Sequence, residues 1–450
     1  MDSIPPAALP LLLHLAPAFT QPTFRRAVVL LFAALLTTGR RTVHNLLRTV
    51  GILAPGDSSS YRRVLSEASW SGLRLAAALT RFVVAHFGPA GVLRLVGDDT
   101  VDEHRGQKVF GKARHRDPIR SSHSYTTYRY GHKWVVVAVL SRFPWATRPW
   151  ALPLLVALYR SPKDNAQCQR PHQTPAELVQ LQLRLLLRWL PDRSFVFAGD
   201  QGYGSHELAF FAAQHGGRLT LVSRFYADAN LYEPPPVVEG KRPAHRPRKK
   251  GAKLPRPQDV VAASAERTPL NVAWYGGGRR DVAVVTGVGH WYKSGVGLVA
   301  VRWVYVHDCS GTHRDDYLYS TNVAMTATEI IETYTGRWNI ETTFQEMRAY
   351  LGLETTRGWC RQTVQRAAPC LFGLYTVVAV LYAALRSQGT ATASVDWAKK
   401  PGTTFSDAIT TVRRWLWTEW VFARLGHDEA FAKVPDDLRE ILLSALAPAA

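Results

Sequence analysis

Acidic residues and cysteines are both scarce in this sequence, and each scarcity excludes a class of protein. Aspartate and glutamate together number 35 among 450 residues, against 55 lysines and arginines, so the net charge is +20. A charge of this sign favours a polyanionic partner, with nucleic acid favoured over an anionic membrane. The four cysteines contain no CxxC pair and no zinc-finger spacing. We therefore expect reduced, buried thiols in a cytosolic protein.

Signals for export and membrane insertion are also lacking. The N-terminal apolar run carries Asp2 where a signal peptide has basic residues, and Pro10 and Pro17 interrupt it. One stretch of 19 residues without a charge, residues 367–385, is long enough in principle to cross a bilayer. The sequence has no second stretch of this kind, and basic residues flank it. We therefore predict a buried core helix and no membrane.

Residues 1–89 have the pattern of several short helices. Serines stand where helix caps are expected, and a Thr-Gly pair separates two helical stretches. Arginines lie along these helices at Arg40, Arg41, Arg48, Arg62 and Arg63. Short basic helices suit a DNA-binding region, and the alternative is a helical cap with solvated arginines.

Beyond this region the pattern changes to strands. Residues 90–223 hold three strand-like runs and then alternating helix and strand, which predicts an α/β layer with a mixed sheet. Residues 224–314 interrupt it, first with a proline-rich segment that has eight lysines and arginines and no acid between residues 241 and 256. A run of alternating β-branched and aromatic residues follows, typical of an antiparallel meander. Residues 315–388 return to the core, and residues 389–450 form a helical C-terminal region.

Residues 334–348, YTGRWNIETTFQEMR, have the periodicity of one helix with a charged face. At about 100° per residue, four side chains fall within an arc of about 60°. They are Tyr334, Arg337, Glu341 and Arg348. The alternative to a functional face is an exposed ion pair between Arg337 and Glu341, which stabilises a helix by about 0.2–0.5 kcal/mol. A tyrosine and a second arginine on the same face favour the functional interpretation.

Further acids follow two strand-like runs. Asp98 and Asp99 end VLRLVGDD, and Asp200 ends SFVFAGD. Carboxylates at strand ends of an α/β sheet lie where ligands bind, although most single aspartates of this kind only head a turn. Together with Glu341, such acids can converge as oxygen ligands for two Mg²⁺ ions, which clamp the attacking and leaving oxygens of a phosphodiester. Bound metal also reverses the local charge and lets phosphate approach.

These blocks, in this order, resemble the DDE transposases of bacterial insertion sequences. Cut-and-paste members carry a Y-x2-R-x3-E-x6-K pattern on the helix of the third acid, and here Arg348 stands in place of the lysine. GDDT resembles the family's Asp-x-Thr block, which indicates Asp98 as the first acid and leaves Asp99 as the second choice. GDQGYG resembles the block of the second acid, Asp200.

The resemblance implies a ribonuclease-H-like mixed sheet with helices, interrupted by a β-rich insertion and flanked by helical N- and C-terminal regions. It implies that Asp98, Asp200 and Glu341 are catalytic and hold two Mg²⁺ ions, for which Mn²⁺ can substitute. The residues expected to contact DNA are Tyr334, Arg337, Arg348 and Arg105 from the resemblance, and Arg246, Arg248, Lys249 and Lys250 from the charge of the basic segment. That segment is expected to be mobile without DNA and ordered over it. Trp291 and Trp303 can stack on an unpaired base, but we favour core packing for both.

The function implied is a transposase that binds the terminal inverted repeats of its element, cleaves DNA at the element ends and joins the 3′-OH ends to target DNA. It would act as a homodimer on double-stranded DNA in the bacterial cytoplasm, at the nucleoid. Two alternatives stay open. One is a ribonuclease-H-like nuclease without strand transfer, and the other is a non-catalytic, DNA-binding relic of a transposase. Whether cleavage passes through a hairpin also stays open.

Overall fold

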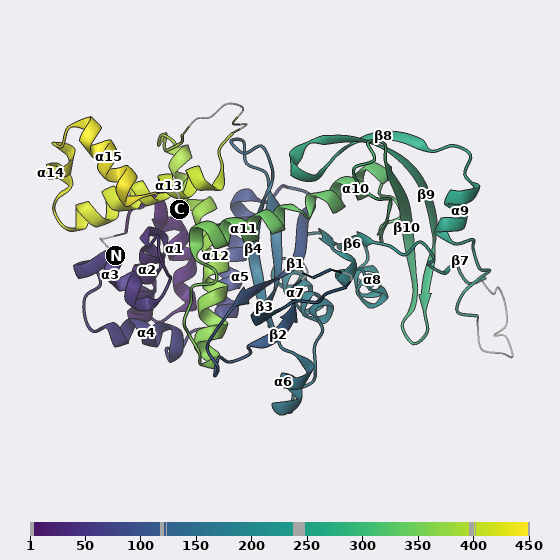
Figure 1. The fold of residues 1–450 in the computed structure, drawn as a ribbon, viewed down its shortest axis with the longest axis horizontal. Coiled ribbons are helices and arrows are strands. Elements are labelled where there is room, and N and C mark those ends of the chain that lie inside the picture. The colour runs from purple at the N-terminus through teal and green to yellow at the C-terminus, as the bar shows by residue number, and fades with distance from the viewer. Residues whose placement is uncertain are drawn as a thin grey trace.

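The protein has three parts along its longest axis (Figure 1). Helices from both ends of the chain lie at one end, a mixed sheet lies in the middle, and long antiparallel strands lie at the other end. The computed structural model describes residues 4–117, 121–122, 124–236, 248–395, 400 and 402–448. The mixed sheet with many helices confirms the α/β class expected from the sequence. The domain boundaries given above stay a prediction.

Helices make up the described part of the N-terminal region, as its pattern predicts. The α-helices are α1 (Leu9–Leu15), α2 (Gln21–Leu36), α3 (Val43–Val50), α4 (Ser58–Ser66) and α5 (Gly72–Phe87), joined by 3-10 helices at Pro6–Ala8, Ala16–Ala18 and Gly51–Leu53. Polar residues begin three of them. The side chains of Thr42, Asp57 and Ser71 accept hydrogen bonds from backbone N–H groups of the first turn, which satisfies donors that lack a helical partner.

Arg41 has a structural position that differs from the DNA-facing one we expected. Its side chain is 6% exposed. The guanidinium donates hydrogen bonds to the carbonyl oxygens of Gly39 and Tyr350, each at 2.6 Å. It therefore joins the N-terminal helices to the helix that carries Glu341. Arg40 and Arg48 remain exposed.

The central sheet combines antiparallel and parallel strands. Its members are β1 (Leu93–Glu103), β2 (Ala113–Arg116), β3 (Tyr128–Ser141), β4 (Trp150–Tyr159), β5 (Phe195–Gly199) and β6 (Leu219–Arg224). β3 pairs antiparallel with β1, β2 and β4, and β5 pairs parallel with both β1 and β6. The strand order is therefore β4-β3-β1-β5-β6. Runs of valine, alanine and leucine in β3 and β4 are buried, as expected for strands inside a sheet covered on its faces.

Helices between these strands begin where the sequence supplies caps. α6 (Pro162–Gln167), α7 (Pro175–Trp189) and α8 (His206–Ala213) follow Ser161, Thr174 and Ser205, and each cap side chain accepts from the third residue beyond it. At α7 the cap is reciprocal, because the Glu177 carboxylate also accepts from the Thr174 backbone at 2.7 Å. α7 contacts β3 and β4 through its apolar face, so it helps to bury the strands beside β1.

The β-rich part extends the same sheet rather than forming a separate layer. It contains β7 (Leu231–Tyr232), α9 (Pro257–Ala263), β8 (Thr268–Ala273), β9 (Arg279–Lys293), β10 (Gly297–Asp308) and β11 (Asp316–Ser320). β8, β9, β10 and β11 pair antiparallel in sequence, and β11 pairs with β6. The turn between β8 and β9 uses Gly276 and Gly277, whose φ angles of 73° and 88° favour glycine.

The stretch expected to be one helix is two helices. α10 (Ala327–Gly336) and α11 (Asn339–Leu351) are separated by Arg337 and Trp338. These two residues keep helical dihedral angles, but the backbone N–H groups there bond three residues back, for example Arg337 N to Tyr334 O at 3.1 Å. The tighter turn changes the angle between residues on its two sides, so the arc calculated for a regular helix is wrong across this junction.

The remaining helices are α12 (Arg361–Ser387), α13 (Phe405–Leu416), α14 (Asp428–Ala432) and α15 (Asp436–Leu446), with a π-helix at Trp417–Phe422. Among the described residues, one helix, α12, is long and apolar enough to cross a membrane. Inside the protein, 72% of its most apolar 18-residue stretch is buried. It packs on β4 and on the N-terminal helices α4 and α5. This is the position of the core helix predicted for residues 367–385.

The cysteines differ in part from expectation. All four are free, which agrees with reduced thiols. Cys168, Cys309 and Cys370 are exposed and Cys360 is half-buried, so the prediction that they are buried is wrong. Cys370 lies on α12, and the other three lie outside the regular helices and strands.

Candidate active site

Two neighbouring strands bring two of the predicted acids together. β1 and β5 pair in parallel up to Gly97 and Gly199, and the next residues along the two strands are Asp98 and Asp200. We expected Asp98 at the end of its strand, but β1 continues to Glu103 and it is β5 that ends. A side chain at Gly97 would not fit, since a Cβ there would lie 2.4 Å from the Phe197 ring. The acids thus lie where β1 loses its neighbour on one side.

Asp98 and Asp99 face different neighbours, as alternation along a strand requires. The Asp98 carboxylate accepts a hydrogen bond from Arg337 at 2.8 Å. The Asp99 carboxylate instead forms an ion pair with Lys133 at 2.9 Å and accepts from the Tyr203 hydroxyl at 3.1 Å. Of the two, Asp98 therefore lies on the side of Glu341. This geometry agrees with Asp98 as the first acid, and its catalytic role stays a prediction.

Arg337 joins two of the three acids. Its Nη1 lies 2.8 Å from Oδ2 of Asp98 and 3.0 Å from Oε1 of Glu341. The arginine is only 8% exposed, so the alternative of a surface ion pair between Arg337 and Glu341 is wrong. Its position at the junction of α10 and α11 places the guanidinium between β1 and the first turn of α11.

The three carboxylates repel one another. Burial raises the pKa of Asp98 to about 7, with Asp200, Asp99 and Glu341 adding to the rise and Arg337 opposing it. Burial also raises the pKa of Glu341, again with a contribution from Asp200 and opposition from Arg337. A bound cation would favour the charged form of such acids and lower their pKa again. Arg337 supplies one positive charge against three acids, and the oxygen donors suit a hard divalent ion.

The loop after β5 holds Asp200 through short contacts. Its Oδ1 accepts from the Gly202 N–H at 2.9 Å, and its carbonyl oxygen accepts from the Ser223 hydroxyl at 2.7 Å. Gly204 must be glycine here, because a Cβ would lie 2.7 Å from Oγ of Ser223 and 2.9 Å from the Arg224 carbonyl oxygen. The GDQGYG block thus fixes the acid between β5 and β6.

Tyr334 and Arg348 lie on either side of this group along the helices. Tyr334 is 3% exposed and lines a small cavity together with Arg224, Tyr275 and Asp316. Arg348 lies away from the acids, where its guanidinium donates to the Thr100 hydroxyl and pairs with Glu354 at 2.9 Å. Thr100 is two residues beyond Asp98 on β1. Among the described residues, the recorded side-chain partners of Arg348 are thus Thr100 and Glu354 rather than the three candidate acids.

The other residues expected to bind DNA are dispersed. Arg105 is exposed and lines a cavity of about 450 Å³ between the β1–β2 loop and the segment after α11. Arg246 lies outside the described residues, and Arg248 and Lys249 are exposed. Lys250 instead has its ammonium group 3.8 Å from the centre of the Tyr232 ring, and Lys253 bridges to the same strand. From Lys250 onward the segment therefore makes cation–π and strand contacts within the chain, while its expected mobility without DNA stays a prediction.

Tryptophans divide into packed and exposed ones. Trp303 is 3% exposed, and Trp291 lies among the rings of His206, Phe225, Tyr226 and Tyr319, which confirms core packing for both. Trp338 is 42% exposed directly beside Arg337, and Trp359 is 67% exposed at the cavity that Arg105 lines. Sequence reasoning missed both. The available signal for Trp338 was its place inside the YTGRWN block.

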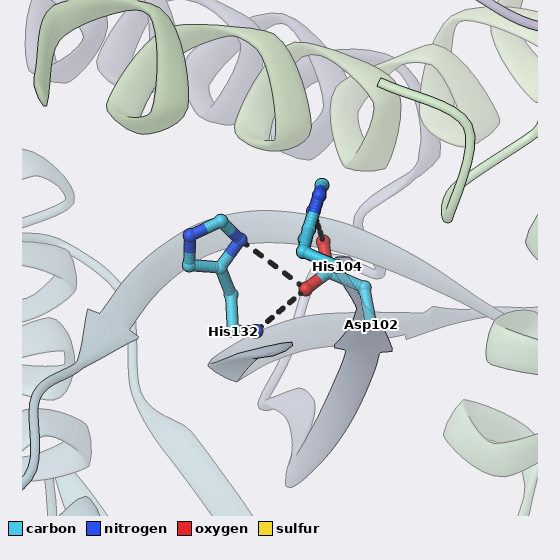
Figure 2. A group of neighbouring side chains, drawn as sticks. All are labelled: Asp102, His104 and His132. Carbon is cyan, nitrogen blue, oxygen red and sulfur yellow. Dashed lines mark hydrogen bonds and ion pairs between the residues drawn. The ribbon is translucent and has the colours of Figure 1, made fainter. Parts of the chain in front are cut away.

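A second group of chemically active side chains lies further along β1. It consists of Asp102 on β1, His104 directly after β1, and His132 on β3 (Figure 2). All three residues are buried. The sequence did not indicate this group, because Asp102 and His104 are close together but His132 is 28 residues further along the chain. Asp102 and His132 are opposite each other in the β1–β3 ladder, which only the fold reveals.

The class of protein follows from comparison with known families. Residues 14–281, more than half of the chain, match the family described as DDE superfamily endonuclease, and the chain belongs to this family. Residues 299–381 match a second family, described as "Archaeal putative transposase ISC1217". DDE endonucleases use divalent metals. These matches confirm the DDE class expected from the sequence, while the bacterial insertion-sequence group stays a prediction.

The chain is also similar to one solved structure, described as a cryo-EM structure of piggyBac transposase synaptic complex with hairpin DNA. The sequence identity is 11%, the TM-score is 0.44, and the match covers 95% of this chain and 77% of that one. No curated protein matches the sequence.

Proposed function

We propose that the protein is a DNA transposase whose catalytic acids are Asp98, Asp200 and Glu341. The observation that carries the proposal is the shared contact of Asp98 and Glu341 with one nitrogen of Arg337, beside Asp200, in a DDE superfamily endonuclease. Strand order supports it. The central strands are arranged β4-β3-β1-β5-β6, with the first acid on β1, the second after β5 and the third on a later helix, as in a ribonuclease-H-like core.

The acids fit a site for two Mg²⁺ ions. They are oxygen donors whose burial, together with repulsion from neighbouring acids, raises the pKa of both Asp98 and Glu341, and Arg337 leaves a surplus of negative charge. When bound, the ions supply positive charge to the scissile phosphate and lower the pKa of the attacking hydroxyl or water. Arg337 keeps Asp98 and Glu341 in place through its two ion pairs, and Gly202 and Ser223 keep Asp200 in place.

The reaction we propose has two steps at each element end. Water attacks the phosphorus, the bond between phosphorus and O3′ breaks, and a 3′-OH is released. That hydroxyl then attacks a phosphodiester of the target DNA. The target's own bond between phosphorus and O3′ breaks, and an ester bond to the element end replaces it. No covalent bond to the protein forms. We propose that Tyr334, which lines a small cavity, and the half-exposed Arg348 position the terminal strand.

DNA binding is proposed for further basic residues of the chain. Arg105 and the exposed Arg248 and Lys249 belong to a chain of net charge +20, which favours contact with phosphates. We propose that two copies of the chain hold two element ends, and that Arg348 replaces the lysine of the Y-x2-R-x3-E-x6-K pattern as a charged contact. Cytoplasmic action at the nucleoid belongs to the same proposal.

A strand-transfer assay tests this function against both alternatives. The substrate is a duplex with the inverted repeat that flanks the gene, one strand ending in 3′-OH, mixed with a plasmid target and Mg²⁺ or Mn²⁺. A transposase gives the end covalently joined to the plasmid. Cleavage without joined product would identify a nuclease that lacks strand transfer, and binding without cleavage would identify a non-catalytic relic.

A further inference from the structure

A compact group of potential metal ligands, distinct from the candidate catalytic acids, consists of Asp102, His104 and His132. One ligand atom from each lies within 4.8 Å of the others, and all three residues are buried. Figure 2 shows the two imidazole rings on either side of the Asp102 carboxylate. Asp98 precedes Asp102 by four residues on β1, which corresponds to about 13 Å of strand, so the two groups are separate.

His132 has a buried nitrogen whose surroundings call for a cation. Its Nε2 lies 2.9 Å from the Phe110 carbonyl oxygen, which can only accept, so Nε2 carries the hydrogen. In neutral imidazole Nδ1 then presents a lone pair. Nδ1 has no hydrogen-bond partner among the described residues and lies 3.4 Å from Oδ1 of Asp102. A lone pair facing a carboxylate oxygen in a dry interior is unfavourable unless a positive ion lies between them.

The nitrogen–oxygen separations within the group are compatible with metal ligands. Nδ1 of His132 lies 3.4 Å from Oδ1 of Asp102, and Nε2 of His104 makes a long hydrogen bond of 3.3 Å with Oδ2. A charge-assisted hydrogen bond between nitrogen and oxygen is about 2.7–2.9 Å long. Ligand atoms about 2.0–2.1 Å from a tetrahedral Zn²⁺ ion are instead about 3.3–3.4 Å apart.

The carboxylate is also held by other donors, as metal ligands usually are. Asp102 accepts from the Trp134 indole N–H at 3.0 Å and from the His132 backbone N–H at 2.9 Å. These bonds fix its orientation and leave lone pairs for an ion. His104 adjoins the cavity of about 450 Å³, which gives an ion a path from solvent and space for a water ligand.

We propose that Asp102, His104 and His132 bind one Zn²⁺ ion or a similar divalent ion with affinity for imidazole, apart from the catalytic ions. Mg²⁺ does not fit, because two of the three ligands are imidazole nitrogens, and Mg²⁺ prefers oxygen ligands. The ion would tie β1 to β3 and fix the start of the β1–β2 loop, which carries Arg105. This site is independent of the transposase proposal.

Metal titration of the full chain tests the site. The protein, without a histidine tag, is stripped with a chelator, dialysed, and titrated with Zn²⁺ and separately with Co²⁺ in excess Mg²⁺. We expect one equivalent of Zn²⁺ to bind and Co²⁺ to give the visible spectrum of a tetrahedral site with nitrogen and oxygen ligands. His104→Gln and His132→Gln should each weaken Zn²⁺ binding by at least about tenfold. His115→Gln is the matched control, since His115 is a buried histidine on β2 outside the group.

Two results would overturn the site. The first is stripped wild-type chain that binds no equivalent of Zn²⁺ or Co²⁺, which would leave a charged hydrogen-bond network of histidines and aspartate. The second is unchanged affinity in both histidine variants, which would assign the ion to other residues such as the cysteines. Thermal melting of each variant in chelator separates loss of metal from loss of the fold, and the wild-type titration decides even if a variant does not fold.

Discussion

Arg337 Nη1 lies 2.8 Å from Oδ2 of Asp98, although the two residues are 239 positions apart in the chain. The contact joins the junction of α10 and α11 to the middle of β1. The same nitrogen reaches Glu341, so a single guanidinium connects the first acid to the third. The arrangement of the candidate site therefore depends on this arginine as well as on the acids.

Arg337→Ala should destabilise the fold more than loss of a surface ion pair does. Removing one partner of a buried pair leaves uncompensated carboxylates and costs about 3–5 kcal/mol, against about 0–1 kcal/mol for an exposed pair. Urea denaturation measures the change. Arg439→Ala, which breaks an exposed pair with Asp436, is the control. Mg²⁺ should restore part of the lost stability in Arg337→Ala only. Equal losses in both variants would show that Arg337 does not hold the site together.

Asp98→Asn and Asp99→Asn should differ in metal-dependent DNA cleavage. Asp98 faces Arg337 and Glu341, so its variant should be inactive. Asp99 contacts Lys133 and Tyr203 on another side, so its variant should keep reduced activity. Cleavage of an end-containing duplex in Mg²⁺ gives the comparison. An inactive Asp99→Asn together with an active Asp98→Asn would move the first acid by one residue.

Trp338→Ala should weaken binding of a DNA end that has an unpaired base. Trp338 is 42% exposed beside Arg337, and stacking of one base on an aromatic ring is worth about 1–3 kcal/mol. Fluorescence titration with paired and unpaired ends tests this. Trp359→Ala is the comparison, because Trp359 is also exposed but lies at the cavity that Arg105 lines, away from Arg337. Equal effects of the two substitutions on unpaired ends would exclude a specific role for Trp338.

The basic segment should contribute to binding through its exposed members. Replacing Arg248 and Lys249 with alanine should reduce the slope of log K against log salt by about 1–2 units, since each phosphate contact contributes about 0.9. Terminal-repeat and random duplexes should be affected alike, because contacts to phosphates carry no sequence information. Lys250→Ala should change the slope less, as Lys250 packs on Tyr232. An unchanged slope in the double variant would show that the segment is only a linker.

Local patterns predicted the fold well where one element's own residues decide its structure. The Thr-Pro start and the apolar face that follows it predicted the helix that the structure has as α7. The valine-rich run predicted the buried strand β3. The junction at Arg337 and Trp338 was not foreseen. Periodicity alone describes a regular helix, whereas the tighter turn coincides with the contact of Arg337 to Asp98 on a strand distant in the sequence.

The candidate site could be predicted only as far as motifs extend. Three blocks that resemble those of DDE transposases indicated Asp98, Asp200 and Glu341, and the Asp-x-Thr match favoured Asp98 over Asp99. Burial could not be predicted in this way. Arg41 and Tyr334 resemble exposed side chains in the sequence but are buried by packing between separate parts of the chain. The group of Asp102, His104 and His132 exists only because β1 and β3 pair in the observed register.

Cleavage and strand transfer by Glu341→Gln test the central claim most directly. Glutamine keeps the size of the side chain and can still hydrogen-bond to Arg337, but it lacks the charge that a divalent ion requires. The measurement is the rate of both steps in Mg²⁺ on an element-end duplex, with end binding followed in parallel. Both reactions should be abolished in Glu341→Gln, while end binding stays close to that of the wild type. Cleavage by Glu341→Gln at a rate near that of the wild type would contradict it.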